Sequence, residues 1–194
     1  MFCDDKIYAM IFPIKVMGWT RTIGNYALFG AISRTVPSIH NENRVRMFPF
    51  GGLDKPPSCF SVRVPGYMVE HFASLEDQLL NVNKRALLVM APSINPIRPA
   101  RSLLSKIVVI HGFKEEQQGG LEAFKAHFDR ALRCKFGCSA PYVIGQKKVI
   151  KVKDVLVDGF EVRIDSLSEA DSMTIQSLGI GGRGHLGCGV FEKA

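Results

Sequence analysis

Two stretches of this 194-residue chain carry the same pattern, one in each half. KIYAMIFPIK begins at Lys6 and KIVVIHGFK begins at Lys106. Each is an apolar, strand-like run bounded by lysines, and each is followed by apolar residues at helical spacing. The helical spacing is carried by Leu28, Phe29, Ile32 and Val36, closed by Pro37, in the first half, and by Leu121, Phe124, Phe128, Ala131 and Leu132 in the second. A chain that repeats a strand–helix unit is expected to fold as two similar subdomains.

Strand signals follow both predicted helices. In the first half, residues 59–72 read as a hairpin turned at Pro65-Gly66, followed by a short helix over 75–80 and a strand over 86–90. In the second half, residues 147–165 read as a hairpin turned at Asp158-Gly159, because this dipeptide favours a two-residue turn.

A second helix and a last strand complete the second half. Ser168 and Asp171 have the spacing of a capping box, so a helix is predicted after Ser168, and CGVFEK (188–193) predicts the final strand. The second half therefore has the order β-α-β-β-α-β of ferredoxin-like folds, and the first half fits this order less clearly. We predict an α+β fold with two tandem ferredoxin-like (RRM-like) subdomains, at residues 1–92 and 103–194, joined by a proline-rich linker at 93–102.

Charge favours an anionic partner. The formal net charge is +7 and the isoelectric point is about 9.3, which favours nucleic acid ahead of membrane as the partner, although a basic protein that binds neither stays open. No run of 18 apolar residues is present and no signal peptide is visible, so we expect a cytoplasmic protein without a membrane partner.

Cysteine usage argues against a metal site. The five cysteines are an odd number and are expected to be free thiols in a reducing compartment. Cys134 and Cys138 are spaced C-x3-C without a second pair of ligands, which is not the pattern of a zinc site. We expect neither a metal nor a cofactor.

A glycine tract, GIGGRGHLGCG, runs from Gly179 to Gly189 near the end of the chain. It contains G-x-G-x-x-G, but a helix precedes it and a strand follows, which is the reverse of a dinucleotide-binding turn. Consecutive amides in such a turn can bind an anion, and an arginine adds a phosphate donor; a purely structural loop is the alternative. The predicted RNA-binding residues of the tract are Gly179, Gly181, Gly182, Arg183, Gly184 and His185.

Two stretches resemble one known family. LGIGGRGHLGCGVF (178–191) is similar to the C-terminal signature of the RAMP superfamily of CRISPR-associated proteins. YALFGAISRTVPSIHNENRVRMFPFGG (26–52) resembles the helix and loop in which the sixth CRISPR-associated family, the endoribonucleases that cut precursor CRISPR RNA within its repeats, carries its catalytic histidine. The glycine signature also occurs in noncatalytic RAMP subunits, so the second stretch bears the enzyme prediction.

The resemblance implies the site residues. His40, Tyr26 and Arg46 match the family's grouping of a histidine, a tyrosine and a basic residue, although Phe48 stands where some relatives have a histidine before proline. We interpret the other histidines, His71, His111 and His127, as structural or surface residues. Basic residues expected on RNA are Arg44, Lys147, Lys148, Lys151 and Lys153, with Lys151 and Lys153 on one face of the predicted hairpin.

The predicted function is a metal-independent endoribonuclease that binds a CRISPR repeat hairpin and cleaves it by attack of the RNA's own 2′-hydroxyl. The resemblance also implies other CRISPR effector-complex subunits as partners that the protein can join with its product. A noncatalytic RAMP subunit that binds guide RNA in a CRISPR effector complex is the first alternative. An unrelated ferredoxin-like enzyme or small-molecule binder is the second.

Overall fold

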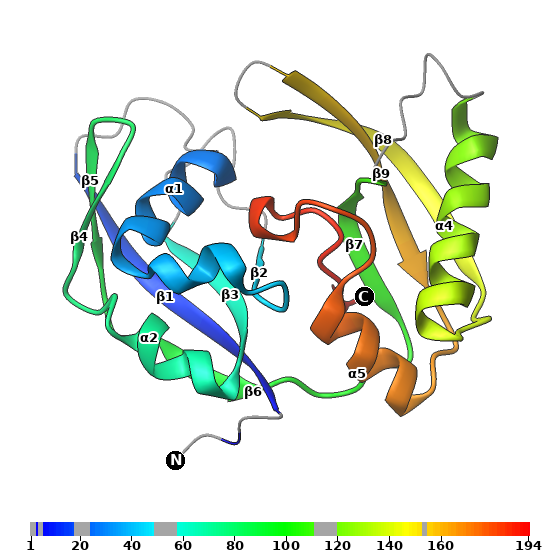
Figure 1. The fold of residues 1–194 in the computed structure, drawn as a ribbon, viewed down its shortest axis with the longest axis horizontal. Helices are drawn as coiled ribbons and strands as arrows, with labels where there is room; N and C mark the ends of the chain where they lie inside the picture. The colour runs from blue at the N-terminus through cyan, green and yellow to red at the C-terminus, as the bar shows by residue number, and fades with distance from the viewer. Residues whose placement is uncertain (1–2, 4–5, 18–23, 49–57, 111–119, 153–154) are drawn as a thin grey trace. The chain divides into compact units, whose positions relative to one another are not determined.

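The computed structural model describes residues 3, 6–17, 24–48, 58–110, 120–152 and 155–194 (Figure 1). It is an α+β fold with two antiparallel sheets, and the chain divides into two compact units. The first unit holds Met1–Ile97 together with His185–Gly187, and the second holds Arg98–Gly184 and Cys188–Ala194. Residues 185–187 therefore belong to the first unit although the chain on both sides of them belongs to the second.

The first unit is built on a long central strand. Its elements are β1 (Ile7–Met17), α1 (Asn25–Thr35), the 3-10 helix η1 (Pro37–Asn41), β2 (Arg46–Met47), β3 (Cys59–Pro65), the 3-10 helix η2 (Gly66–Met68), α2 (Val69–Ala73), β4 (Leu79–Val82), β5 (Arg85–Val89) and β6 (Ser93–Pro96). The sheet order is β2-β3-β1-β5-β4, and β6 also pairs with β1. The predicted first strand and helix are confirmed, and Leu28 and Ile32 of α1 are buried in one core with Phe12 of β1.

The hairpin predicted at Pro65-Gly66 is wrong. The chain after β3 coils into η2 and α2 instead of turning back into a strand. Val69 and Phe72 are both fully buried, and a spacing of three residues brings them to one face only in a helix. Burial of these two side chains therefore decided the helix, and His71 lies on it.

The helix predicted over 75–80 is also wrong. Residues 79–82 form β4, in which buried Leu80 and Val82 alternate with exposed Leu79 and Asn81. Asn83 and Lys84 both have positive φ, 52° and 64°, which forms the two-residue turn that joins β4 to β5. The strand predicted over 86–90 is confirmed as β5 (85–89).

The second unit contains a four-stranded sheet in the order β10-β7-β9-β8. Its described elements follow the predicted order of strands and helices: β7 (Leu103–Val108), α4 (Gly120–Phe136), β8 (Tyr142–Val152), β9 (Val155–Ile164), α5 (Glu169–Leu178) and β10 (Glu192–Lys193). The 3-10 helix η3 (Gly184–Leu186) precedes β10 in the chain, and its residues 185 and 186 belong to the first unit. Ser168 is the N-cap of α5, as predicted, and its Oγ accepts the Asp171 N–H at 3.0 Å. Phe124 and Phe128 of α4 form the core with Phe160 of β9.

The turn predicted at Asp158-Gly159 is wrong, because both residues lie inside β9. A Cβ on Gly159 would lie 2.5 Å from the Val108 carbonyl oxygen, so glycine is needed there for the close approach of β7. β8 ends at Val152 and β9 begins at Val155, and Lys153 lies outside the described residues.

The proline-rich segment is partly a strand, since residues 93–96 of the predicted linker form β6 and pair with β1. The two units meet in sequence between Ile97 and Arg98. In the part of the chain that the structure describes, every helix is too short or too polar to cross a membrane.

Candidate functional site

Tyr26 and His40 line one groove in the first unit, with a volume of about 360 Å³. One wall is a single face of α1, since residues 26, 29, 30, 33 and 34 recur at helical spacing. The opposite wall comes from the β4–β5 hairpin, through Asn81 and Asn83. The groove therefore joins two of the three residues that the sequence predicts to be catalytic.

The position of His40 follows from the end of α1. Val36 closes the helix and Pro37 begins η1, because proline tolerates only the first turn of a helix. Ile39 is fully buried and anchors η1 in the core, so the next side chain, His40, faces outward and is exposed. Its ring makes a T-shaped contact with the Phe29 ring, with ring centroids 5.2 Å apart and an interplanar angle of 82°.

His185 contacts the same Phe29 ring. The two rings are stacked, with centroids 5.1 Å apart and planes within 9°. His185 Nε2 lies 3.0 Å from the Glu42 carbonyl oxygen, and it donates there when it carries the proton. Burial lowers the pKa of His185, the hydrogen bond to Glu42 opposes this, and the nearby charges of Arg46 and His40 lower the pKa further. The neutral imidazole is thus favoured.

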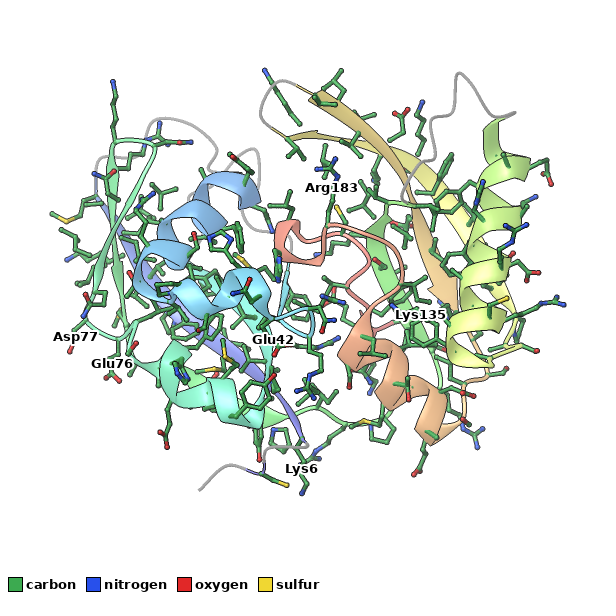
Figure 2. All side chains as sticks on the ribbon, viewed as in Figure 1. Lys6, Glu42, Glu76, Asp77, Lys135 and Arg183 are labelled. Carbon is green, nitrogen blue, oxygen red and sulfur yellow. The ribbon has the colours of Figure 1, made fainter. Side chains whose placement is uncertain are left out.

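Arg44, predicted to bind RNA, lies in a small network beside this loop. Its Nη2 donates to Tyr67 Oη at 2.8 Å, and the guanidinium carbon lies 5.2 Å from the centre of the Tyr67 ring. Glu42 accepts the Arg44 backbone N–H at 2.7 Å and a hydrogen bond from Tyr67. Burial raises the pKa of Glu42, but these hydrogen bonds outweigh it and hold the pKa below its usual value. Figure 2 labels Glu42 among these side chains.

Arg46, the third predicted catalytic residue, is not among the residues that line the groove. Its Nη1 donates to the carbonyl oxygens of Asn43 and Val45, at 2.5 and 3.1 Å. Burial lowers its pKa, and the carboxylate of Glu42 opposes this. The guanidinium thus braces the loop that runs from His40 to β2.

Arg34 lines the groove and was missed by sequence reasoning. Its Nη2 donates to the Asn81 carbonyl oxygen at 2.7 Å. The signal was present, because Arg34 stands two helical turns after Tyr26 on the same face of α1. Phe29, which contacts both histidine rings, contributed to the sequence analysis only as part of the helical spacing.

The glycine tract packs along the edge of β7. Gly182 N–H donates to the Val109 carbonyl oxygen at 2.8 Å, and Gly189 N–H donates to that of Ile107 at 2.7 Å. Gly181 has φ = +94°, and a Cβ there would lie 2.3 Å from the same Val109 oxygen. These amides hold the tract against the sheet. Positive φ is shared by Gly179, Gly181, Arg183, Gly187 and Gly189.

The close packing around Gly181 predicts how a substitution there changes the stability of the protein. Gly181→Ala should destabilise the protein by about 2–3 kcal/mol, because its Cβ meets a backbone oxygen and its φ is unfavourable for a side chain. Gly182→Ala is the matched control, since the nearest atom to its Cβ is 4.0 Å away. Urea denaturation measures both. Equal urea midpoints for the two variants would mean that the backbone around Gly181 shifts to accept the Cβ without loss of stability.

Arg183 is the exposed charge of the tract. It has φ = 62°, which a non-glycine residue adopts only at a cost, and such strain is typical of functional positions. Figure 2 shows the side chain projecting from the ribbon of the tract. Its guanidinium has no hydrogen-bond or ion-pair partner among the described residues.

Lys147, Lys148 and Lys151, which are predicted to bind RNA, lie on β8, an edge strand. Lys147 Nζ lies 3.5 Å from an Asp158 carboxylate oxygen, and Lys148 Nζ donates to Gln146 Oε1 at 3.2 Å. Lys151 is exposed. Lys153, which was predicted to share a face with Lys151, lies outside the described residues.

Neither thiols nor carboxylates gather into a metal-binding group in the described ranges of the chain: no three His, Cys, Asp or Glu side chains come together there. Cys134 and Cys138 are free thiols. A second hollow, of about 310 Å³, lies at the start of α5 and includes none of the predicted site residues in its lining.

Comparisons with known proteins connect these features to one family. A family model described as Cas6 Crispr matches residues 23–193. The CRISPR-associated endonuclease Cas6 of Myxococcus xanthus (strain DK1622) is 29% identical over 173 residues, which cover 86% of this chain and 73% of the relative.

Solved structures match the fold over almost the whole chain. A CRISPR associated protein Cas6 superposes with a TM-score of 0.70 at 12% identity, covering 97% of this chain and 100% of the other. Thermus thermophilus Cse3, bound to an RNA representing a pre-cleavage complex, superposes with a TM-score of 0.56 at 15% identity, covering 96% and 98%. At these identities the likeness is one of fold.

Proposed function

The chain belongs to the Cas6 family, and from this premise we propose that it is an endoribonuclease that binds CRISPR repeat RNA and cuts precursor CRISPR RNA into guide units. The observation that carries the proposal is the groove that Tyr26 and His40 line together. The name of the Myxococcus xanthus relative, an endonuclease, supports the activity, and the RNA bound to Thermus thermophilus Cse3 supports the substrate class.

Both units are proposed to be ferredoxin-like. The second unit has the strand order β10-β7-β9-β8, in which the first and third strands of the motif are central. The first unit has the related order β2-β3-β1-β5, with β4 added at the edge. The similar strand orders support the proposal that the repeated sequence pattern produces two subdomains of the same kind.

The proposed reaction needs the RNA's own 2′-hydroxyl. Its oxygen attacks the adjacent phosphorus, the bond from phosphorus to the 5′-oxygen of the next nucleotide breaks, and a 2′,3′-cyclic phosphate remains. The proton leaves the 2′-hydroxyl for the His40 imidazole and is returned to the leaving 5′-oxygen, while the Tyr26 hydroxyl donates to the phosphate. No step in this scheme requires a metal ion.

His185 and Arg46 are proposed to position the His40 loop. His185 holds Glu42 through the carbonyl oxygen and stacks on Phe29, the ring that His40 also contacts. Arg46 ties two carbonyl oxygens of the same loop. Both contacts restrict the positions that the His40 ring can adopt. This matters because a general acid or base must lie within hydrogen-bond distance of the atom whose proton it transfers.

RNA binding is proposed to involve the exposed Arg183 together with the glycine tract and the lysines of β8. Removing Arg183 should weaken binding and flatten its salt dependence, because each phosphate neutralised contributes about 0.7 to 0.9 to the slope of log K against log salt. Arg183→Gly is the informative variant, since glycine also relieves the positive φ and should raise thermal stability slightly. Titration of repeat RNA at several salt concentrations measures the slope. An unchanged slope would show that Arg183 does not contact phosphate.

The proposal is tested by incubating the protein with a panel of hairpin repeat RNAs and analysing the product ends. One cut per repeat, leaving a 2′,3′-cyclic phosphate or its opened form, is expected. RNA that is bound but never cut would favour a noncatalytic RAMP subunit of an effector complex. Absence of RNA affinity at low salt would favour an unrelated small-molecule binder.

A further inference from the structure

The groove beside His40 extends well past the two proposed catalytic side chains. Its floor is opened by Gly30, where an added Cβ would find no atom within 4 Å. Gly30 stands one helical turn after Tyr26, so the opening begins directly beside the tyrosine. A volume of about 360 Å³ is within the range of pockets that take a small-molecule-sized group.

The far wall of the groove is the free edge of β4, which ends the sheet of the first unit. The two-residue turn makes Val82 and Arg85 the closing, hydrogen-bonded pair, so Asn81 and Ala86 form the next, non-hydrogen-bonded pair. The N–H and C=O of Asn81 therefore point away from β5. Arg34 donates a hydrogen bond to the Asn81 C=O, and the Asn81 N–H is a hydrogen-bond donor at the same edge of the strand.

The groove thus combines a cation, hydrogen-bond donors and an aromatic face. Arg34 keeps further N–H groups beyond the one that Asn81 accepts, because a guanidinium has five. Asn83 adds a side-chain amide, and Tyr26 is 42% exposed. A cation beside an aromatic face is the chemistry of single-stranded nucleotide binding, in which the base stacks and the phosphate is neutralised.

We propose that this groove binds the unpaired nucleotide next to the scissile phosphate, with its base against Tyr26 and its phosphate on Arg34. The inference rests on the proposed function, because His40 closes the same groove and must lie at the reacting phosphate. In this proposal Arg34 is the cation of the groove that binds phosphate, whereas Arg46 donates to the carbonyl oxygens of its own loop. Gly30 is the residue that keeps the base site open.

Gly30→Leu tests the proposal by filling the groove while Tyr26, His40 and Arg34 are all kept. Leucine is a better helix former than glycine, so α1 should remain folded, and Gly30→Ala is the matched control that leaves most of the groove open. Binding is measured with the full chain and a repeat hairpin made uncleavable by 2′-deoxy sugars. A single abasic sugar is moved one position at a time across the unpaired flanks of the hairpin.

Wild type and Gly30→Ala should lose about tenfold in affinity when the abasic sugar occupies one particular position. Gly30→Leu should bind the intact hairpin about tenfold more weakly and lose nothing further at that position. Arg34→Gln should reduce the salt slope by about 0.7 to 0.9. An abasic penalty of wild-type size in Gly30→Leu, or the absence of any position with a penalty in wild type, would overturn the proposal.

These outcomes separate the groove from the reaction. Cleavage of ordinary RNA by wild type is assayed independently, and its absence would remove the proposed function. The affinity measurements use uncleavable RNA, so they decide the nucleotide site whether or not the protein cuts.

Discussion

Replacing His40 with alanine should abolish RNA cleavage and leave RNA affinity nearly unchanged. The imidazole is proposed to carry the proton between the 2′-hydroxyl and the leaving oxygen, and a general acid–base group of this kind contributes about 10² to 10⁴ in rate. Its contribution to affinity is small, because binding is spread over many phosphate contacts. Single-turnover cleavage and equilibrium binding of the same hairpin measure the two effects.

Two variants make the His40 result specific. His40→Asn keeps a polar side chain of similar reach but cannot carry the proton, so it should be as slow as alanine. His71→Ala removes another exposed histidine of the first unit, outside the groove, and should cleave normally. A loss of affinity equal to the loss of rate would make His40 a contact residue, and undiminished cleavage by His40→Ala would remove it from the mechanism.

A single 2′-deoxy sugar immediately upstream of the scissile phosphate should stop cleavage completely. Removing this hydroxyl removes the nucleophile, whereas as a hydrogen-bond partner it is worth only about 0.5 to 1.5 kcal/mol. Binding of the modified hairpin should therefore stay close to that of the unmodified one. Gel analysis of cleavage, with a parallel binding titration, measures both.

The matched control for this substrate is a 2′-deoxy sugar one nucleotide further upstream, which should be cut at the normal rate. Chelation with EDTA should leave cleavage of unmodified RNA unchanged. The opposite pair of results, in which the deoxy substrate is cut and EDTA stops the reaction, is expected of a metal-activated water. That pair would leave His40 without the role proposed for it.

Local sequence patterns predicted the parts of the fold that depend on neighbouring residues. The spacing of Leu28 and Ile32 predicted α1, and Ser168 predicted the start of α5, because helical periodicity and capping act within one or two turns. The same kind of pattern failed at Pro65-Gly66 and in β4, where burial against the rest of the first unit outweighed the turn and helix signals.

The candidate site, like the fold, was predicted where it depends on residues close in the chain and missed where it depends on distant ones. Tyr26 and His40 were found from the sequence because one helix and its terminating proline set their order along the chain. Arg34 was missed, since its contact to the Asn81 carbonyl oxygen joins α1 to β4, a strand that the sequence did not predict: a helix was predicted over 75–80 instead.

The sequence by itself determined the repeated strand–helix units, the +7 charge and the glycine tract, because each is a property of residues close in the chain or of their total. Only the tertiary structure decided how these parts are used. His185 contacts Glu42 across 143 positions of sequence and stacks on Phe29, while Gly159 and Gly181 admit the close approach of backbone carbonyl oxygens. Such contacts depend on which distant segments fold against one another, and no local preference for a turn or a loop specifies that choice.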